Sequence, residues 1–254
     1  MTPDGDELSG DVVRVGNTVR RDTKPWSSSV QTLLALLHEH GFDRCPLPLG
    51  IDQLGRDTVG FIEGDPWQSM GPRVLWSEST LVEVARLLAR FHAAQMDFRF
   101  HVGAVWCALE KDEAPPEVVC HNDFGLHNIV FRDSSPYAVV DFDLAAPGSM
   151  LWDLAFAAIS TVPIRDPADL NPMPNDVLDA GRRLRMMCDA YGLGGERRRL
   201  IPVISKRLER MASWIKAAQQ DGRPVKASLV SELSILDRAQ AYLARETSRI
   251  KAYL

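Results

Sequence analysis

The chain is poor in cysteine, and it lacks the segments that direct a protein to or across a membrane. Its four cysteines are widely spaced among 254 residues and form no C-x-x-C pair, so neither a zinc knuckle nor a disulfide framework is indicated. The first ten residues have no basic start and no apolar stretch of the kind found in signal peptides. No apolar run approaches the ~20 residues of a membrane-spanning helix. We therefore expect a reduced, cytoplasmic protein without a membrane partner.

The chain has no long cluster of basic residues either. The formal net charge is -5, and the densest basic run is three arginines, Arg197 to Arg199. Because nucleic-acid binding requires many Lys and Arg contacts to the phosphate backbone, no nucleic-acid partner is expected. What remains is an ordinary globular composition, with 45% hydrophobic and 25% charged residues. A chain of this length and composition can form one large domain or two smaller lobes.

The amino-terminal part predicts a small unit of mixed structure. β-Branched residues alternate around a Gly-Asn pair, which predicts a hairpin from about Asp11 to Arg21. A leucine stripe, preceded by serines and followed by a glycine, predicts a helix over Ser27–His40. A further strand ends where glycine and proline follow, near residue 64. We therefore expect a small strand-containing lobe over residues 1–64.

Residues 65–254 predict a larger and mainly helical lobe. Apolar residues recur at helical spacing from Glu78 to Gln95, the strongest helical pattern in the chain. Further helices are expected at 151–160, 175–191, 197–219 and 226–252. Strands are expected only in the intervening block. The expected fold class is thus α+β, with a small lobe followed by a larger helical one.

The intervening block, Val119–Asp153, has polar side chains at the ends of short apolar runs. Asp123 lies in a turn after V-V-C, Asn128 precedes I-V-F, and Asp141 follows A-V-V. This spacing lets one loop present Asp123 and Asn128 on the same side, and oxygen ligands of this type suit Mg²⁺. Phosphoryl transfer requires metal ions that neutralise phosphate charge and a carboxylate that orients the attacking hydroxyl. The block therefore predicts a metal-dependent phosphoryl-transfer site.

The same residues resemble the motifs of a known family. H-N-D-F-G-L-H-N is similar to the catalytic loop of the aminoglycoside phosphotransferase and choline kinase family, the small-molecule relatives of protein kinases. V-V-D-F-D resembles the family's metal-binding motif, and G-S-M-L-W-D-L-A resembles the motif that follows it. The resemblance implies a protein-kinase-like two-lobe fold with a reduced amino-terminal lobe. It also implies ATP- and Mg²⁺-dependent transfer of the γ-phosphoryl group to a small-molecule hydroxyl, for example of an amino sugar or amino alcohol.

The resemblance assigns roles to residues around the catalytic loop. It implies that Asp123 orients the substrate hydroxyl and that Asn128 and Asp141 bind Mg²⁺. His121 is expected to brace the loop through hydrogen bonds, and Asp153 to tie the following helix back to it. Asp143 is a further candidate metal ligand, although the family often has an acidic residue here that does not bind metal.

Nucleotide binding is assigned to the small lobe by the same resemblance. In the family, a basic residue on a strand pairs with the nucleotide's phosphates, and a glutamate on the next helix orients it. The strand T-V-R-R offers Arg20 for this role, with Arg21 as the alternative. The stretch F-I-E-G resembles the linker whose backbone hydrogen-bonds adenine, which makes Phe61, Ile62 and Glu63 the candidate contacts.

Three departures from the family pattern concern the small lobe and the catalytic loop. About ten residues precede the predicted hairpin, which is too few for the usual glycine-rich hairpin over the phosphates. The helix expected at 27–40 has Val30 and Gln31 where the orienting glutamate belongs. Asn122 replaces the usual glycine of H-G-D, although asparagine tolerates turn conformations better than most residues.

Two alternatives therefore stay open. The departures favour a catalytically impaired kinase-like protein that binds a ligand or a partner. A transition-metal cluster of His121, Asp123 and His127 would instead indicate a metal hydrolase.

The later helices also carry acidic residues that either attract a cationic substrate or form solvated faces: Asp176, Asp179, Asp189 and Glu232. The sequence does not predict the oligomeric state.

Overall fold

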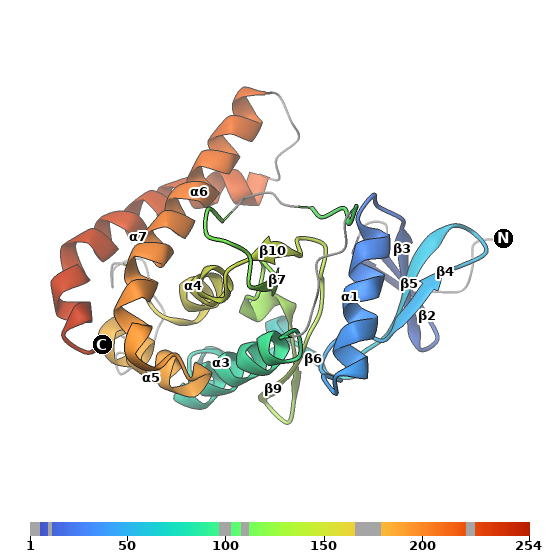
Figure 1. Cartoon of the computed structure of the whole chain (residues 1–254), viewed down its shortest axis with the longest axis horizontal. Coiled ribbons are helices and arrows are strands. Elements are labelled where there is room, and N and C mark those ends of the chain that lie inside the picture. The colour runs from blue at the N-terminus through green and yellow to red at the C-terminus, as the bar shows by residue number, and fades with distance from the viewer. Residues whose placement is uncertain (1–5, 10–11, 97–102, 108–111, 166–178, 222–226) are drawn as a thin grey trace.

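The chain folds into a small lobe built on one sheet and a larger lobe built mainly from helices (Figure 1). A computed structural model describes residues 6–9, 12–96, 103–107, 112–165, 179–221 and 227–254. In Figure 1 the small lobe lies on the right and the helical lobe on the left. This arrangement confirms the predicted α+β fold class.

A five-stranded antiparallel sheet forms the small lobe, with strand order β1-β2-β3-β5-β4. Its strands are β1 (Asp6–Ser9), β2 (Val12–Val15), β3 (Thr18–Asp22), β4 (Pro48–Ile51) and β5 (Arg56–Gly60). The predicted hairpin is confirmed as β2 and β3, whose turn contains Gly16 at φ +58°, a conformation that glycine adopts without strain. The expectation that no further hairpin precedes it is wrong, because the four residues of β1 pair with β2.

Helix α1 (Ser27–Glu39) packs against this sheet beside β4. Its leucine stripe forms the buried face, with Val30, Leu33, Leu34 and Leu37 almost fully enclosed. Burial of each such side chain contributes ~1.5–3 kcal/mol relative to exposure. The predicted helix is therefore confirmed to within one residue.

The large lobe contains the remaining helices. They are α2 (Pro72–Leu75), α3 (Glu78–Ala93), α4 (Met150–Thr161), α5 (Ala180–Tyr191), α6 (Leu200–Gln220) and α7 (Ala227–Lys251), with 3-10 turns η1 (Trp67–Ser69), η2 (Leu126–Asn128) and η5 (Gly194–Arg199). The predictions at 78–95 and 151–160 are confirmed as α3 and α4. Those at 197–219 and 226–252 correspond to η5 with α6, and to α7. The predicted helix start at residue 175 lies outside the described residues.

Local caps explain where two of these helices begin. The Ser77 hydroxyl accepts a hydrogen bond from the Thr80 N–H at 3.1 Å at the start of α3. The Ser149 hydroxyl accepts one from the Trp152 N–H at 3.3 Å at the start of α4. Each such cap stabilises a helix by ~1 kcal/mol. The serine of the G-S-M-L-W-D-L-A motif is thus a helix cap.

Two short antiparallel sheets hold the loops of the central block. One pairs β7 (Val118–Cys120) with β10 (Ala146–Gly148), and the other places β8 (Ile129–Arg132) between β6 (Asp65–Pro66) and β9 (Ser135–Val139). We call residues 121–128, between β7 and β8, the H-N-D loop, and residues 140–145, between β9 and β10, the D-F-D loop. Because β7 neighbours β10 and β8 neighbours β9, the two loops lie side by side.

The chain crosses from the small to the large lobe just before β6. Gly64 has φ +151°, and a Cβ atom there would lie 2.5 Å from the Phe131 carbonyl oxygen. Only glycine therefore fits at this crossing. The boundary between residues 64 and 65 stays a prediction.

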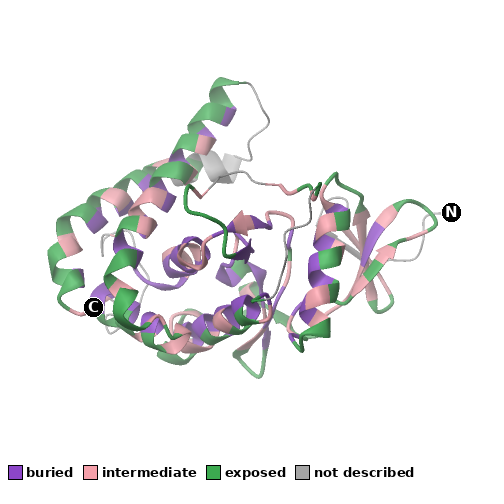
Figure 2. Cartoon of the chain, viewed as in Figure 1, coloured by how far each residue is buried: buried purple, intermediate pink, exposed green. Residues whose placement is uncertain are grey.

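The loops rest on the core of the large lobe. Figure 2 shows buried residues along α3 and α4. The Phe91 ring of α3 lies 6.3 Å from that of Phe124 and 5.9 Å from that of Phe142, one from each loop, and all three are buried. Truncation of such a side chain to alanine typically costs ~3–5 kcal/mol.

Within the described residues, no helix combines the length and apolar character needed to cross a bilayer.

Candidate active site

The H-N-D loop holds the carboxylate of Asp123 between two hydrogen-bond donors. Asp123 Oδ1 accepts from His127 Nε2 at 3.0 Å, and Oδ2 accepts from Asn128 Nδ2 at 2.9 Å. The same Asn128 amide also donates to the Asp123 carbonyl at 3.0 Å. The Asp123 side chain is 24% exposed, so part of it faces solvent. A carboxylate held in this way can orient a hydroxyl group and accept its proton.

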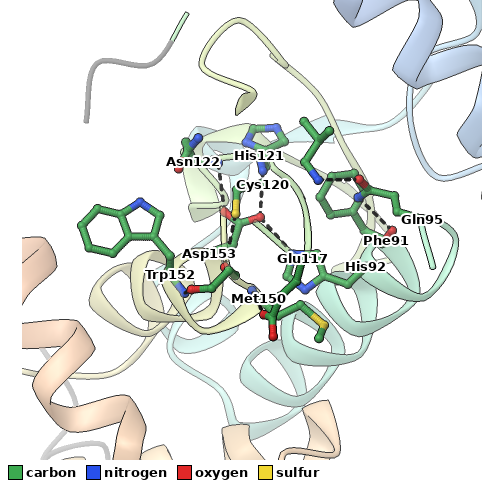
Figure 3. Close-up of polar contacts among 12 residues, drawn as sticks. Phe91, His92, Gln95, Glu117, Cys120, His121, Asn122, Met150, Trp152 and Asp153 are labelled. Atoms are coloured by element: carbon green, nitrogen blue, oxygen red, sulfur yellow. Dashed lines mark hydrogen bonds and ion pairs between the residues drawn. The ribbon is translucent and has the colours of Figure 1, made fainter. Parts of the chain in front are cut away.

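A fully buried carboxylate, that of Asp153 in α4, fixes the backbone at the start of this loop (Figure 3). It accepts from the N–H of His121 at 2.7 Å and from the N–H of Asn122 at 2.9 Å. His92 of α3 donates to it from Nε2 at 3.1 Å, while Nδ1 of the same ring lies 2.7 Å from the Tyr191 hydroxyl. Burial raises the pKa of Asp153, but these hydrogen bonds and the charge of His92 hold it below its ordinary value. The expected tie between helix and loop is present.

His92 was not predicted as part of this brace. A single histidine on an amphipathic helix has no distinguishing pattern in the sequence, and its partner Asp153 lies 61 residues further along the chain. Only the packing of α3 against α4 brings the two side chains together.

The ring of His121 links the two loops. Its Nε2 donates to the Val140 carbonyl at 3.0 Å, and its Nδ1 accepts from the Asp123 N–H at 3.3 Å. The ring also packs edge-on against the ring of Phe142, with centroids 4.6 Å apart. Both ring nitrogens are therefore engaged by the backbone, and the described residues contain no group of three or more His, Cys, Asp or Glu suited to a metal ion. The transition-metal cluster is not supported.

Asn122 fastens the loop to two further elements. Its φ of +65° explains why a residue that tolerates the left-handed region replaces the usual glycine. Its side chain donates to the Leu144 carbonyl at 3.0 Å and accepts from Arg207 Nη1 at 3.1 Å, while its carbonyl accepts from Arg207 Nη2 at 2.6 Å. Arg207 is a buried residue of α6, 85 positions away, and no sequence pattern pointed to it.

Oxygen donors for a divalent metal ion lie beside Asp123. The Val140 N–H donates to the Asn128 carbonyl at 2.9 Å, which sets Asn128 next to the D-F-D loop. Because the Asn128 amide nitrogen is bound to Asp123, its Oδ1 is the atom left for a cation. Asp141 has φ +65° and a side chain that is 53% exposed. Burial raises the pKa of Asp143, an effect that Arg21 opposes.

This donor set fits Mg²⁺. Magnesium is commonly held by one or two carboxylates together with water and substrate phosphates. An amide oxygen and one carboxylate are available without Asp143. The half-buried carboxylate of Asp143 already pairs with Arg21, which makes it the weakest of the three candidates.

Arg21 of β3 reaches the D-F-D loop from the opposite lobe. Its Nη1 lies 2.7 Å from Asp143 Oδ1 and 3.8 Å from Asp141 Oδ1. Its Nε donates to Asp57 Oδ2 of β5 at 3.1 Å. A guanidinium group in this position places a fixed positive charge beside the candidate metal ligands.

The position of the two side chains favours Arg21, the alternative, over Arg20 for this role. Arg20 Nη1 lies 3.6 Å from Asp52 Oδ2, which also binds Arg56, and this hydrogen bonding lowers the pKa of Asp52 to about 2. Arg21 lines the cleft between the lobes, whereas Arg20 does not. Side chains alternate along a strand, so only one of two neighbouring arginines can face the cleft.

A cleft of about 460 Å³ lies between the sheet and the D-F-D loop. Apolar side chains from both lobes line it: Val12, Val19, Val59, Phe61, Ile62, Val130, Val140 and Phe142. Charged residues also line it: Arg21, Asp22, Lys24, Asp141 and Asp143. The cleft is thus apolar over most of its wall and charged where the two lobes meet.

Of the three linker residues, Phe61 and Ile62 line this cleft and Glu63 does not. The Glu63 carboxylate pairs with Arg14 at 2.9 Å, and its carbonyl accepts from Arg132 Nε at 2.9 Å. Arg14 also lies over the Phe61 ring at 3.6 Å. The Glu63 carboxylate is therefore turned toward Arg14, and its contact with a nucleotide base stays a prediction.

The acidic residues of the later helices form structural contacts where they are described. Asp179 caps α5 by accepting from the Arg182 N–H at 3.0 Å, and it accepts from the Tyr253 hydroxyl at 2.8 Å. Asp189 pairs with Arg197 at 2.5 Å. Asp176 and the side chain of Glu232 lie outside the described part of the chain. These contacts favour the structural role over attraction of a cationic substrate.

Sequence comparison agrees with this geometry. Residues 29–201 match the family model described as "Phosphotransferase enzyme family". The trifolitoxin immunity protein of Rhizobium leguminosarum bv. trifolii is 31% identical over 193 residues, which cover 74% of this chain and 72% of that protein.

Solved structures share the two-lobe fold. A choline/ethanolamine kinase family protein from Mesorhizobium loti matches with a TM-score of 0.65 and 17% identity, over 99% of this chain and 92% of that one. Amicoumacin kinase, in complex with AMP-PNP and Ca²⁺, matches with a TM-score of 0.66 and 9% identity, over 96% and 89%. Identities this low establish a shared fold and leave activity to be argued from the site.

Proposed function

Because the chain belongs to the phosphotransferase enzyme family, we propose that it transfers the γ-phosphoryl group of ATP to a hydroxyl group of a small molecule. The observation that carries this proposal is the position of Asp123 beside the oxygen donors of Asn128 and Asp141, next to an apolar cleft. The reaction depends on Mg²⁺ and takes place in the cytoplasm, where ATP is available.

In this reaction Asp123 orients the acceptor hydroxyl group. One bond forms between the acceptor oxygen and the γ-phosphorus, and the bond from that phosphorus to the oxygen retained by ADP breaks. The hydroxyl proton passes to the Asp123 carboxylate, which His127 and Asn128 hold in place. A positioned base of this kind contributes ~10²–10⁴-fold to the rate.

The charged end of the cleft suits the phosphate groups. Bound Mg²⁺ neutralises phosphate charge in reactions of this type. Asn128 Oδ1 and the Asp141 carboxylate are the proposed ligands, with Asp143 as an additional one. Arg21 supplies a second positive charge from the small lobe.

The apolar part of the cleft suits the nucleotide base. Its volume of about 460 Å³ lies within the ~300–1,000 Å³ of small-ligand sites. Valines of both lobes would enclose the faces of the ring, and the backbone at Phe61 and Ile62 would bind its edge. This assignment leaves the phosphates at the charged end.

We assign the acceptor to the class of amino sugars, amino alcohols and similar hydroxyl compounds. This assignment rests on family membership and on the names of the structural neighbours, a choline/ethanolamine kinase family protein and amicoumacin kinase. The described acidic residues of the later helices give it no further support, because they are engaged in structural contacts.

A second candidate is a protein that binds a small molecule without phosphorylating it. The similarity to a protein named for immunity to a toxin favours this alternative, since immunity requires no particular chemistry. The full set of Asp123, Asn128 and Asp141 favours catalysis.

Calorimetric titration with MgATP tests the proposal, followed by a screen of hydroxyl compounds for ADP release. The variant Asp141→Asn removes a proposed ligand, and we expect it to weaken MgATP binding ~10-fold or more. Asp133→Asn is the matched control, because Asp133 also has positive φ, at +49°, but lies in the exposed β8–β9 turn. Absence of binding at millimolar MgATP would overturn the proposal, and binding without any ADP release would favour the second candidate.

A further inference from the structure

The helix that should carry an orienting glutamate has an amide instead. Gln31 of α1 occupies that region, and its neighbour Asp57 in β5 is an acidic group of the small lobe that contacts Arg21. Arg21 and Asp57 are also direct register partners across β3 and β5. The acid that the family pattern expects on the helix is therefore present on the adjacent strand.

Both oxygens of the Asp57 carboxylate have defined donors. Oδ2 accepts from Arg21 Nε at 3.1 Å, and Oδ1 accepts from Gln31 Nε2 at 2.6 Å. Asp57 is only 1% exposed, so this carboxylate has little access to solvent. A buried carboxylate requires compensation of this kind, because an unpaired charge is costly to bury.

Gln31 is itself held in one orientation. Its Nε2 also donates to the Thr58 carbonyl at 2.9 Å, and its Oε1 accepts from the Gly50 N–H at 2.9 Å. The amide thereby joins α1 to β4 and β5. Its nitrogen must point at Asp57, because a carboxylate only accepts hydrogen bonds.

The neutral amide at position 31 and the acid at position 57 depend on each other. A glutamate at position 31 would set two carboxylates within hydrogen-bonding distance in a buried environment, where one of them must be protonated. The chain thus contains one orienting acid, and its location on β5 excludes a second acid on α1.

We propose that Asp57 and Gln31 are positioning residues that hold Arg21 as the phosphate-binding cation of the nucleotide site. Asp57 occupies Nε of the guanidinium, which turns the terminal nitrogens toward Asp143 and the cleft. A planar group fixed at one nitrogen binds a phosphate with less loss of side-chain freedom. This inference rests on the proposed nucleotide binding.

The test compares ligands that differ in phosphate content. MgATP, tripolyphosphate and adenosine are titrated into the wild type, Arg21→Gln and Asp57→Asn. We expect the dissociation constant for MgATP to rise ~30-fold in Arg21→Gln and ~10-fold in Asp57→Asn. Adenosine binding should change less than about twofold, because the cleft wall is intact. General damage to the small lobe would weaken both ligands.

Asp52→Asn is the matched control. Asp52 is also a carboxylate of the small lobe paired with an arginine, but its partner is Arg20, which does not line the cleft. Its MgATP affinity should stay within about twofold of the wild type. An equal loss in Asp52→Asn and Asp57→Asn would overturn the inference.

A charge relocation makes the test sharper. In Asp57→Asn the new amide nitrogen opposes the Gln31 amide nitrogen, so two donors face each other. Adding Gln31→Glu restores a donor and an acceptor and returns the negative charge to the site. We expect the double variant to recover at least about half of the lost MgATP affinity on a logarithmic scale, whereas Gln31→Glu alone lowers the melting temperature.

The outcomes separate this inference from the proposed function. If the wild type binds MgATP and Asp57→Asn binds it equally well, the inference fails and the proposed function stands. If the wild type binds neither MgATP nor tripolyphosphate, both fail. If tripolyphosphate alone binds and its affinity depends on Asp57, Arg21 binds phosphate at a site that takes no nucleotide, and both the proposed function and the inference fail. Failure of the double variant to exceed Asp57→Asn also counts against the inference.

Discussion

The two walls of the cleft hold their functional residues by different means. In the large lobe, Asp123 belongs to the H-N-D loop, whose backbone N–H groups donate to the buried carboxylate of Asp153. On the small-lobe wall, Arg21 is held by its neighbour in the sheet, Asp57, and by its contact with Asp143 across the cleft. The first arrangement is part of the core of its lobe, and the second connects a buried carboxylate of the sheet to the cleft.

This difference has an energetic consequence. Changes beneath Asp123 leave buried donors without acceptors, so they should lower the stability of the fold. The terminal nitrogens of Arg21 point at the cleft, so removal of Arg21 should lower affinity more than stability. This comparison would be contradicted by a variant beneath Asp123 that lowers affinity more than stability. It would also be contradicted if removal of Arg21 lowered stability more than affinity.

The largest effect is expected from Asp123→Asn. The amide cannot accept the hydroxyl proton, so turnover should fall by ~10³-fold. The backbone contacts made by Asp153 are unchanged, so MgATP affinity should stay within about twofold of the wild type. Steady-state ADP release and calorimetric titration measure the two quantities. Retention of more than a tenth of the wild-type turnover would show that Asp123 is not the base.

The next effect is a loss of stability in Asp153→Asn. The substitution removes the buried carboxylate that accepts hydrogen bonds from His92 and from two backbone N–H groups, so we expect a loss of about 3 kcal/mol in the free energy of unfolding by urea. Asp189→Asn on the exposed side of α5 is the control and should cost less than about 1 kcal/mol. Equal losses in the two variants would contradict the core role of Asp153.

The same variant has a defined pH dependence. The pKa of Asp153 is lowered in the folded state, so the unfolded chain binds its proton at a higher pH than the folded protein does. The stabilisation is therefore complete above the ordinary value of about 3.9 and is lost as the pH falls through the lower folded value. The difference between wild type and Asp153→Asn should shrink below about pH 4 in urea unfolding followed by circular dichroism. A constant difference from pH 3 to pH 7 would argue against this linkage.

The functional residues of the large lobe could be predicted from the sequence because they are close together in the chain. Asp123 and Asn128 are five positions apart, and the apolar runs around them predicted the strands that frame the loop. The tie from Asp153 lies within the same block. Local spacing and apolar patterning were enough to predict these positions.

Partners that only the fold brings together were not predictable in the same way. Arg207 contacts Asn122 across 85 positions, and Asp57 contacts Arg21 across 36. The choice between two adjacent arginines on β3 depends on which face of the sheet looks into the cleft, and the strand alone does not determine this. The missing helix glutamate was a correct observation, but its replacement by Asp57 required the register of β3 and β5.

The smallest effect is expected from Arg20→Gln, and it tests the orientation of β3. Arg20 pairs with a partly exposed Asp52 outside the cleft, and such pairs contribute ~0–1 kcal/mol. We expect less than about 1 kcal/mol of lost stability and less than a twofold change in MgATP affinity, against the ~30-fold change in Arg21→Gln. The two variants differ by one position in the same strand and remove the same charge, so net electrostatics cannot explain a difference between them. An equal loss of affinity in both variants would mean that MgATP affinity depends on the total charge of the sheet. Arg21 would then not be the phosphate-binding cation.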